Sequence, residues 1–260
     1  MHRFMKRLIL LILVVCFVSG INAQAKKPNH NGYNIIYIGN SITYGALHAD
    51  RSKTAPPVLA TEYATKKLGN VHEFANCGRS GATTVDFLPA LNRDFKRVEK
   101  AIATLKEKND AKFVFSFMLG TNDSASTGPT GAPVSNEDYK KNLLTIISRL
   151  REMCPEAIFV LQRPVWYSPN TYNNARYLVA GLNRVTDYVN ILVELANENS
   201  DIYLGDCDSY DIFRHEYQKY MFAEDGNAGT FYLHPNEEGA EKMSKNWGKA
   251  IVAAVKASAR

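Results

Sequence analysis

The chain has 260 residues, of which 45% are hydrophobic, and a formal net charge of +5 at pH 7. This length is enough for one domain with a sizeable core. Lysine and arginine form no cluster in the body of the chain, which excludes nucleic acid as an expected partner. No CxxC or HxxxH spacing is present, so we expect no metal site.

The first 23 residues have the layout of a secretory signal peptide. Three basic residues precede a short apolar run at Leu8–Val18, and small residues end at Ala23, after which we expect cleavage. The run is too short for a comfortable membrane span, and an uncleaved N-terminal anchor is the alternative. Cleavage removes three of the 31 basic residues and none of the 26 acidic ones, so the net charge falls from +5 to +2. We therefore expect a secreted or periplasmic protein with no stable membrane insertion.

Apolar, β-rich runs alternate with longer segments of helical periodicity over residues 24–260. In chain order these are a strand at Asn34–Ile38, a helix at Pro57–Leu68, a strand at Val71–Ala75, helical residues at Thr84–Leu105 in two pieces around Pro89, a strand at Phe113–Met118, a helix from Ser135 to Met153, a strand at Ala157–Leu161, a helix at Tyr172–Asn197, a strand at Ile202–Leu204 and a helix at Asn236–Ala257. This alternation predicts a single α/β domain, in which helices cover both faces of a parallel sheet of about five strands.

Three cysteines follow the N-terminal segment, at positions 77, 154 and 207. An odd number with this spacing fits no disulfide scaffold. Cys154 and Cys207 form one conceivable pair, and buried free thiols at Cys77, Cys154 and Cys207 are the alternative that the pattern favours.

Short polar motifs follow three of the expected strands and precede the last helix. They are Gly39-Asn40-Ser41-Ile42-Thr43, Asn76–Thr83 (NCGRSGAT), Gly120-Thr121-Asn122-Asp123 and Leu233-His234-Pro235-Asn236. Ligands bind at the carboxyl ends of the strands in an open parallel sheet, so we expect the four motifs to converge there. Taken singly, each has an ordinary explanation as a capping serine, a tight glycine loop, an asparagine turn or an exposed histidine.

Together, the order and spacing of these motifs resemble the SGNH/GDSL hydrolase family over the whole expected domain. The resemblance implies a flavodoxin-like, three-layer α/β/α fold and a serine esterase that requires neither a metal nor an organic cofactor. It implies that Ser41 is the nucleophile and that His234 is the general base. It also implies an oxyanion hole formed by the backbone N–H groups of Ser41 and Gly81 and by the side-chain amide of Asn122. Gly81 follows Asn76 by the five residues that the family pattern requires.

The chain departs from the family pattern in two places. Asn40 stands where the family usually has aspartate, a position that mostly organises the turn. Phe231 stands three residues before His234, where the family carries the acid that orients the imidazole. Three explanations remain open: Asp225 supplies a displaced acid, a backbone carbonyl holds the histidine in a Ser–His dyad, or the protein is weakly active.

The resemblance leaves several ester substrates open. Similar secreted enzymes include carbohydrate O-acetylesterases, lysophospholipases and thioesterases. Acetyl esters of glycans are the favoured substrate, because aromatic faces suit sugar rings and four aromatic residues lie in segments expected near the crevice. They are Tyr44, Trp166, Tyr167 and Tyr232. Ordinary packing explains any single one of them, and a glycan-binding protein without strong activity is the alternative that Phe231 raises.

Overall fold

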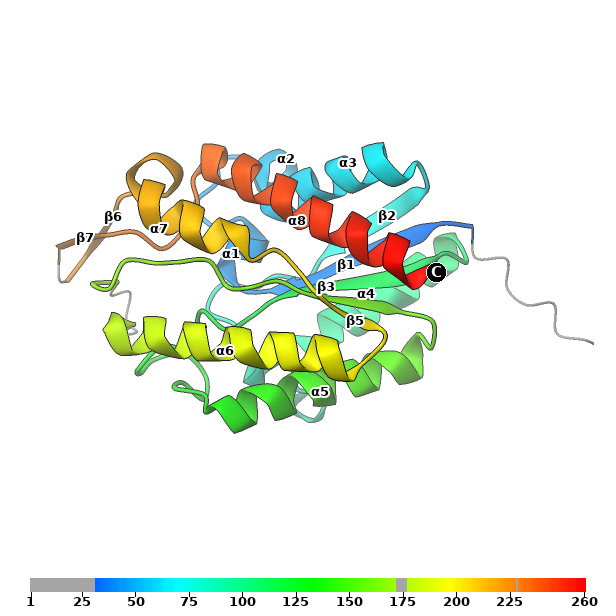
Figure 1. Ribbon diagram of the computed structural model, residues 1–260, viewed down its shortest axis with the longest axis horizontal. Helices are drawn as coiled ribbons and strands as arrows, with labels where there is room; N and C mark the ends of the chain where they lie inside the picture. Colours follow the sequence, from blue (N-terminus) through cyan, green and yellow to red (C-terminus); the bar gives the residue numbers. More distant parts are fainter. Residues whose placement is uncertain (1–30, 172–176, 228) are drawn as a thin grey trace, which may run out of the picture.

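A five-stranded sheet in the order β2-β1-β3-β4-β5 forms the centre of the computed structural model, which describes residues 31–171, 177–227 and 229–260 (Figure 1). The strands are β1 (Tyr33–Gly39), β2 (Val71–Asn76), β3 (Lys112–Met118), β4 (Ile158–Leu161) and β5 (Ile202–Leu204). Every neighbouring pair in this sheet is parallel. This strand order is that of the flavodoxin-like fold, whose ligand crevice opens beside the carboxyl ends of β1 and β3. The predicted fold class is therefore confirmed.

Helices cover both faces of the sheet (Figure 1). The longer helices are α3 (Pro56–Leu68), α4 (Phe95–Lys108), α5 (Asn136–Met153), α6 (Leu178–Glu198), α7 (Asp208–Tyr220) and α8 (Glu237–Ser258). Helices α3, α7 and α8 lie on one face, and α4, α5 and α6 lie on the other. The N-terminal segment with its expected cleavage site lies outside the described residues.

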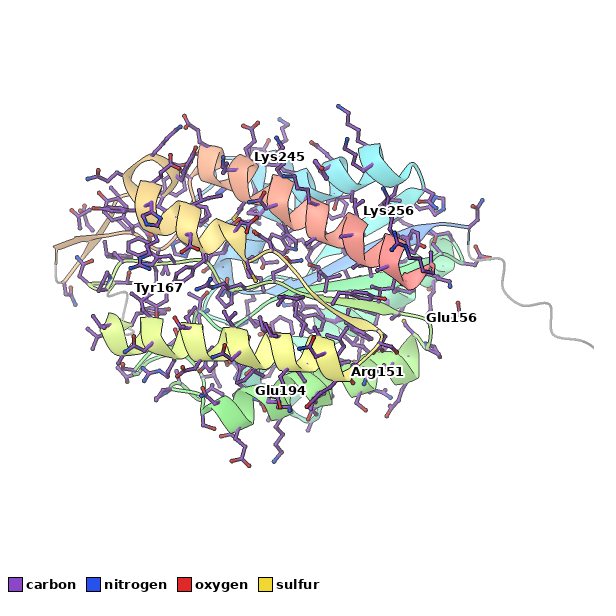
Figure 2. The ribbon with its side chains drawn as sticks, in the orientation of Figure 1. Arg151, Glu156, Tyr167, Glu194, Lys245 and Lys256 are labelled. Atoms are coloured by element: carbon purple, nitrogen blue, oxygen red, sulfur yellow. The ribbon has the colours of Figure 1, made fainter. Side chains whose placement is uncertain are left out.

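The side chains of each central strand are divided between two hydrophobic cores. In β1, Ile35 and Tyr37 pack toward α3 and α8, whereas Ile36 and Ile38 pack toward the opposite helices. Successive side chains of a strand point to opposite faces, so a strand that is covered on both sides is apolar throughout. Trp247 of α8 packs edge-on against Tyr37, with ring centroids 5.4 Å apart. The outer surfaces of the helices carry charged side chains such as Lys245, Lys256 and Glu194, whereas Tyr167 is fully buried (Figure 2).

The structure differs from the sequence-based expectation mainly between the regular elements. Residues 84–105 do not form one helix or two α-helical pieces. They contain two 3-10 turns, η1 (Val85–Phe87) and η2 (Pro89–Leu91), before α4 begins at Phe95. Asn92 has a left-handed backbone with φ of 53°, which an α-helix cannot accommodate.

Several elements, most of them short, were absent from the prediction. They are α1 (Ser41–Tyr44), α2 (Arg51–Thr54), the helix α7 and the hairpin strands β6 (Glu224–Gly226) and β7 (Gly229–Phe231). Helix α6 begins at Leu178, and the expected helical residues 172–176 lie outside the described part of the chain. None of the helices in the described ranges is long and apolar enough to cross a membrane. The cysteines at positions 77, 154 and 207 are all free thiols, so the conceivable pair Cys154–Cys207 is not formed.

Candidate active site

Ser41 lies directly after β1, at the first position of the short helix α1. The side chain of Asn40 accepts a hydrogen bond from the backbone N–H of Ile42 at 3.0 Å and so caps this helix. Glycine is required at position 39, because a Cβ atom there would lie 2.0 Å from Oγ1 of Thr43. The turn therefore places Ser41, which is 9% exposed, at the carboxyl end of β1. Asn40 performs the turn-organising role expected of that position.

The imidazole of His234 connects the Ser41 hydroxyl to a carboxylate. Its Nε2 lies 2.8 Å from Oγ of Ser41, and its Nδ1 lies 2.9 Å from both carboxylate oxygens of Glu224. An ionised carboxylate only accepts hydrogen bonds, so Nδ1 carries the proton and Nε2 is free to accept the hydroxyl proton. The backbone N–H of His234 also donates to Oε1 of Glu224 at 3.1 Å, which fixes the carboxylate on the histidine loop.

Glu224 contacts Nδ1 of the imidazole, where the sequence had left Asp225, a backbone carbonyl or no acid as open explanations. Strands β6 and β7 form an antiparallel hairpin in which Glu224 pairs with Phe231 and Asp225 pairs with Thr230. Adjacent side chains of a strand point in opposite directions, and Asp225 is accordingly exposed to solvent. The carboxylate comes from the residue directly across the hairpin from Phe231, the position at which the family usually carries the acid.

The segment Asn76–Thr84, called here the Gly81 loop, lies beside α1. The Asn76 side chain donates to the carbonyl oxygen of Thr43 at 2.7 Å and accepts from the N–H of Gly78 at 2.9 Å. A Cβ atom at Gly78 would lie 2.5 Å from the backbone nitrogen of Tyr44, so this glycine allows the two segments to touch. Gly81 has a φ of +78°, a left-handed conformation that glycine adopts without strain.

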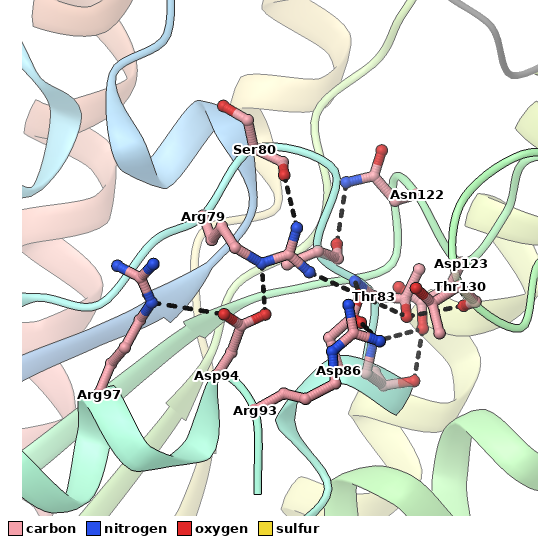
Figure 3. Close-up of polar contacts among 12 residues, drawn as sticks. Arg79, Ser80, Thr83, Asp86, Arg93, Asp94, Arg97, Asn122, Asp123 and Thr130 are labelled. Carbon is pink, nitrogen blue, oxygen red and sulfur yellow. Dashed lines mark hydrogen bonds and ion pairs between the residues drawn. The ribbon is translucent and has the colours of Figure 1, made fainter. Parts of the chain in front are cut away.

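A cluster of charged side chains holds the Gly81 loop in place (Figure 3). The guanidinium of Arg79 contacts Asp94 at 2.5 Å through Nε and Asp86 at 2.9 Å through one terminal nitrogen. The Asp86 side chain is fully buried and also contacts Arg93 at 2.9 Å, while Arg97 contacts Asp94 at 3.4 Å. Both carboxylates are inaccessible to solvent or nearly so, and these guanidinium groups, together with the Thr83 N–H that donates to Asp86 at 3.0 Å, hold them in place.

The side chain of Asn122 projects into the same region from the segment after β3. Its Nδ2 donates to the carbonyl oxygen of Ala82 at 2.9 Å, and its Oδ1 accepts from the hydroxyl of Tyr177 at 2.6 Å. The next residue, Asp123, is fully buried and accepts from both the N–H and the hydroxyl of Thr84. Burial raises the pKa of Asp123 to about 6, against which the hydrogen bonds from Thr84 act.

A pocket of about 430 Å³ opens over these groups. Its wall contains the five residues Ser41, Gly81, Asn122, Glu224 and His234, together with Tyr177 and the largely small or apolar residues Ala46, Leu47, Ser80, Gly128, Pro129 and Leu233. This geometry agrees with the expectation that the four motifs converge, since the pocket wall contains Ser41, Gly81, Asn122 and His234. No group of three or more His, Cys, Asp or Glu side chains in the described ranges could hold a metal ion.

The aromatic residues expected near the crevice, namely Tyr44, Trp166, Tyr167 and Tyr232, do not line this pocket. Tyr44 lies under the guanidinium of Arg51, 4.2 Å from the ring centroid. Trp166 and Tyr232 both pack against Tyr217, at 5.3 and 4.7 Å between ring centroids. Packing therefore accounts for these side chains, and Tyr177 is the aromatic residue that the pocket lining includes.

The geometry is that of a serine nucleophile with its base and orienting acid. Residues 37–242 match the GDSL-like lipase/acylhydrolase family, and the chain belongs to this family. It is a carboxylic ester hydrolase. A search of curated proteins found no match in sequence.

Solved structures of several enzymes share the fold at low sequence identity. An acetylxylan esterase from Geobacillus stearothermophilus is 17% identical with a TM-score of 0.57, the match covering 85% of this chain and 94% of that one. A lipase/acylhydrolase from Enterococcus faecalis is 22% identical with a TM-score of 0.53, over 86% and 95% of the two chains. A gut microbial diltiazem-metabolizing enzyme is 20% identical with a TM-score of 0.55; the match covers 88% of this chain but spans only 48% of that enzyme.

Proposed function

We propose that this chain hydrolyses small acyl esters, above all acetyl esters carried by carbohydrates, with Ser41, His234 and Glu224 as its catalytic residues. One observation carries the proposal. The Ser41 hydroxyl, the His234 imidazole and the Glu224 carboxylate form an unbroken hydrogen-bonded series, with 2.8 Å on one side of the ring and 2.9 Å on the other.

In the first half of the reaction, Oγ of Ser41 attacks the ester carbonyl carbon while Nε2 of His234 takes its proton. The carbonyl oxygen becomes an oxyanion and accepts hydrogen bonds from Nδ2 of Asn122 and from the backbone N–H groups of Gly81 and Ser41. A single donor of this kind is worth about 3 kcal/mol in the transition state. The tetrahedral intermediate collapses as the imidazolium returns the proton to the leaving alcohol, which leaves an acyl-serine.

In the second half, water attacks the acyl-serine and His234 accepts the water proton. Collapse of the second intermediate releases the carboxylic acid and returns the proton to Oγ of Ser41. Glu224 stabilises the imidazolium in both halves and keeps the proton of the neutral ring on Nδ1. Every proton is thus transferred through one imidazole.

The shape of the pocket supports a short acyl group. Glycine, alanine, serine and proline make up much of its wall, and its volume of about 430 Å³ has to contain both the acyl group and part of the alcohol. The fold similarity to an acetylxylan esterase supports a sugar as the alcohol. We assign the carbohydrate to the open side of the pocket, where a large leaving group extends into solvent.

A lysophospholipase or thioesterase activity is the second candidate, and Leu47 favours it. This side chain lines the pocket, is 56% exposed and adopts a left-handed φ of 70°. An exposed leucine beside the nucleophile could contact a longer acyl chain. A series of p-nitrophenyl esters from acetyl to decanoyl separates the candidates, because a preference for acetyl supports the sugar ester and a preference for eight carbons or more supports a lipid or thioester.

Replacement of the nucleophile tests the hydrolase assignment. We expect the S41A variant to lose all measurable release of p-nitrophenol from p-nitrophenyl acetate and to resist labelling by a fluorophosphonate, while its circular dichroism matches the wild type. Full activity in S41A would contradict the assignment. A wild-type protein that binds acetylated xylan but neither turns over nor reacts with the fluorophosphonate would instead indicate a glycan-binding protein.

We also propose that residues 1–23 direct export and are removed, so that the enzyme acts outside the cytoplasm. The arrangement of basic, apolar and small residues in this segment supports the proposal. The mass of the exported protein tests it, since cleavage after Ala23 leaves Gln24 as the first residue.

A further inference from the structure

Tyr177 contributes the second fixed contact to the Asn122 amide. It precedes α6, 55 positions along the chain from Asn122, and its hydroxyl donates to Oδ1 of that residue at 2.6 Å. The tyrosine is 4% exposed and lines the pocket together with Ser41 and His234. Burial raises the pKa of the Tyr177 hydroxyl above its ordinary value, and the nearby charge of Glu224 raises it further. The hydroxyl therefore remains protonated, and able to donate, at neutral pH.

The two contacts leave one orientation for the amide. Nδ2 of Asn122 has two hydrogens, and one of them is donated to the carbonyl oxygen of Ala82. Exchange of oxygen and nitrogen would place Oδ1 against the Ala82 carbonyl, so that two acceptors would face each other. With Oδ1 held by Tyr177, the second hydrogen of Nδ2 remains available to a group bound in the pocket.

Such a contact is needed because the last torsion of an asparagine side chain has a broad energy profile. An oxyanion donor is effective when it is oriented before the reaction, because reorientation during the reaction reduces the stabilisation. We propose that Tyr177 is a positioning residue that holds the Asn122 amide in the orientation that stabilises the oxyanion. This inference depends on the proposed function, in which Asn122 is a donor to the transition state.

The surroundings of Tyr177 limit its own movement. Its ring packs edge-on against Tyr167, with centroids 5.1 Å apart, and its backbone N–H donates to the carbonyl oxygen of Thr171 at 3.3 Å. The next residue, Leu178, has a left-handed φ of 58°, which is strained for a leucine. Strained backbone persists where the surrounding structure determines it, often beside a functional group.

Removal of the hydroxyl alone tests the role of Tyr177. We expect Y177F to lower kcat on p-nitrophenyl acetate about tenfold, the effect of one lost hydrogen bond, with KM changed less than about twofold. Y167F is the matched control. Tyr167 is the other ring of the Tyr167–Tyr177 pair, and its buried hydroxyl contacts Oγ of Ser124 at 2.8 Å rather than Asn122. The kcat of Y167F should therefore stay within about twofold of the wild type.

A double-mutant cycle separates positioning from other roles. N122A should lower kcat on the order of 100-fold by removing the donor. If Tyr177 acts through Asn122, adding Y177F to N122A should change kcat by less than about twofold. A further tenfold loss in that background, a rise in KM at constant kcat, or unimpaired kcat in Y177F would each overturn the inference. Wild-type protein without activity would overturn the proposed function together with it, whereas an active wild type with an unaffected Y177F would overturn the inference alone.

Discussion

Glu224 and Asp225 are adjacent carboxylates whose surroundings differ completely. Glu224 contacts Nδ1 of His234 through both oxygens, whereas Asp225 faces solvent on the other side of the hairpin strand. In the family pattern the acid and the histidine are three residues apart, while the proposed acid Glu224 lies ten residues before His234. The pairing of Glu224 with Phe231 explains how the carboxylate nevertheless arrives at the same place.

We expect E224Q to lower kcat by about 100-fold to 10,000-fold. A glutamine amide can donate to Nδ1, which moves the ring proton to Nε2, the nitrogen that has to accept from Ser41. D225N is the matched control, since it makes the same chemical change one residue away, and its kcat should equal that of the wild type. Steady-state kinetics on p-nitrophenyl acetate provide the measurement. Equal losses of kcat in E224Q and D225N would show that the total negative charge of the hairpin matters, and not a specific acid at Glu224.

The sequence was sufficient to select the residues that the structure brings together at Ser41, Gly81, Asn122 and His234, because each lies in a short motif beside a strand end or a helix start. It was insufficient for Glu224. That residue acquires its position from cross-strand pairing in a hairpin, and no local spacing to the histidine records the pairing. The glycines at 226 and 229 were the available signal for a turn between two short strands.

The Gly81 loop depends on a charged cluster for its shape. Arg79 has a side chain that is 29% exposed and contacts two carboxylates that are 0% and 7% exposed. Removal of one partner of a buried ion pair leaves a charge that water cannot reach. The loop and its backbone donor at Gly81 are therefore expected to be only as well positioned as this guanidinium.

We expect R79A to lower the free energy of unfolding by about 3 kcal/mol and to reduce kcat as well, since the Gly81 loop loses its fixed position. R97A is the control within the same cluster. The Arg97 side chain is 56% exposed and contacts Asp94 at 3.4 Å, so its loss should cost less than about 1 kcal/mol and leave kcat unchanged. Urea denaturation and acetate release measure the two quantities. A stability loss in R97A as large as that in R79A would argue against the distinction.

Most of the long elements followed from periodicity, with α7 as the exception, whereas most of the short ones did not. All five strands of the sheet were predicted: β1, β3, β4 and β5 are largely apolar runs, whereas the edge strand β2 carries His72 and Glu73 between apolar residues. The expected helical residues between 84 and 95 form 3-10 turns, because Pro89 interrupts the backbone hydrogen bonds and Asn92 adopts a left-handed conformation. Strands β6 (EDG) and β7 (GTF) have three residues each, like β5, but they lack the apolar run that marked β5 (IYL).

Burial of Asp123 makes the stability of the whole molecule depend on pH. Its Oδ2 has no hydrogen-bond partner among the residues that the structure describes, and its pKa rises from 3.8 to about 6 on folding. Between about pH 4 and pH 6 the folded chain retains a proton that the unfolded chain has released. The free energy of unfolding should therefore fall as the pH rises through this window and should then level off.

Asp123 should account for a change in the free energy of unfolding on the order of 3 kcal/mol across this window. We expect D123N to lack this part of the pH dependence, because its amide does not titrate. The measurement is the difference in urea-derived stability between the wild type and D123N at about pH 4.5 and pH 7. Any constant cost of the amide cancels in that comparison. A difference that is the same at both pH values would contradict the elevated pKa.

At the level of the molecule, the sequence was sufficient for the α/β class and the five-stranded parallel sheet because the three inner strands, β1, β3 and β4, are buried and largely apolar on both sides. The cores on the two faces are separated by the sheet and share its strands, as Ile35 and Ile36 illustrate. The loops at the carboxyl ends of the strands are positioned by side-chain contacts between distant segments, such as the one between Tyr177 and Asn122. The periodicity of the sequence contains no information on such contacts.

The hairpin formed by β6 and β7 carries the proposed acid at its start and is followed three residues later by the proposed base. Its exposed positions include 225, 227, 229 and 230. A protease that cut the peptide chain between Asp225 and Thr230 would separate the two groups covalently without touching the central sheet. Such a nick would abolish hydrolysis in a protein that still unfolds as a unit, so proteolysis at this hairpin would end the working lifetime of the enzyme before it affected the fold.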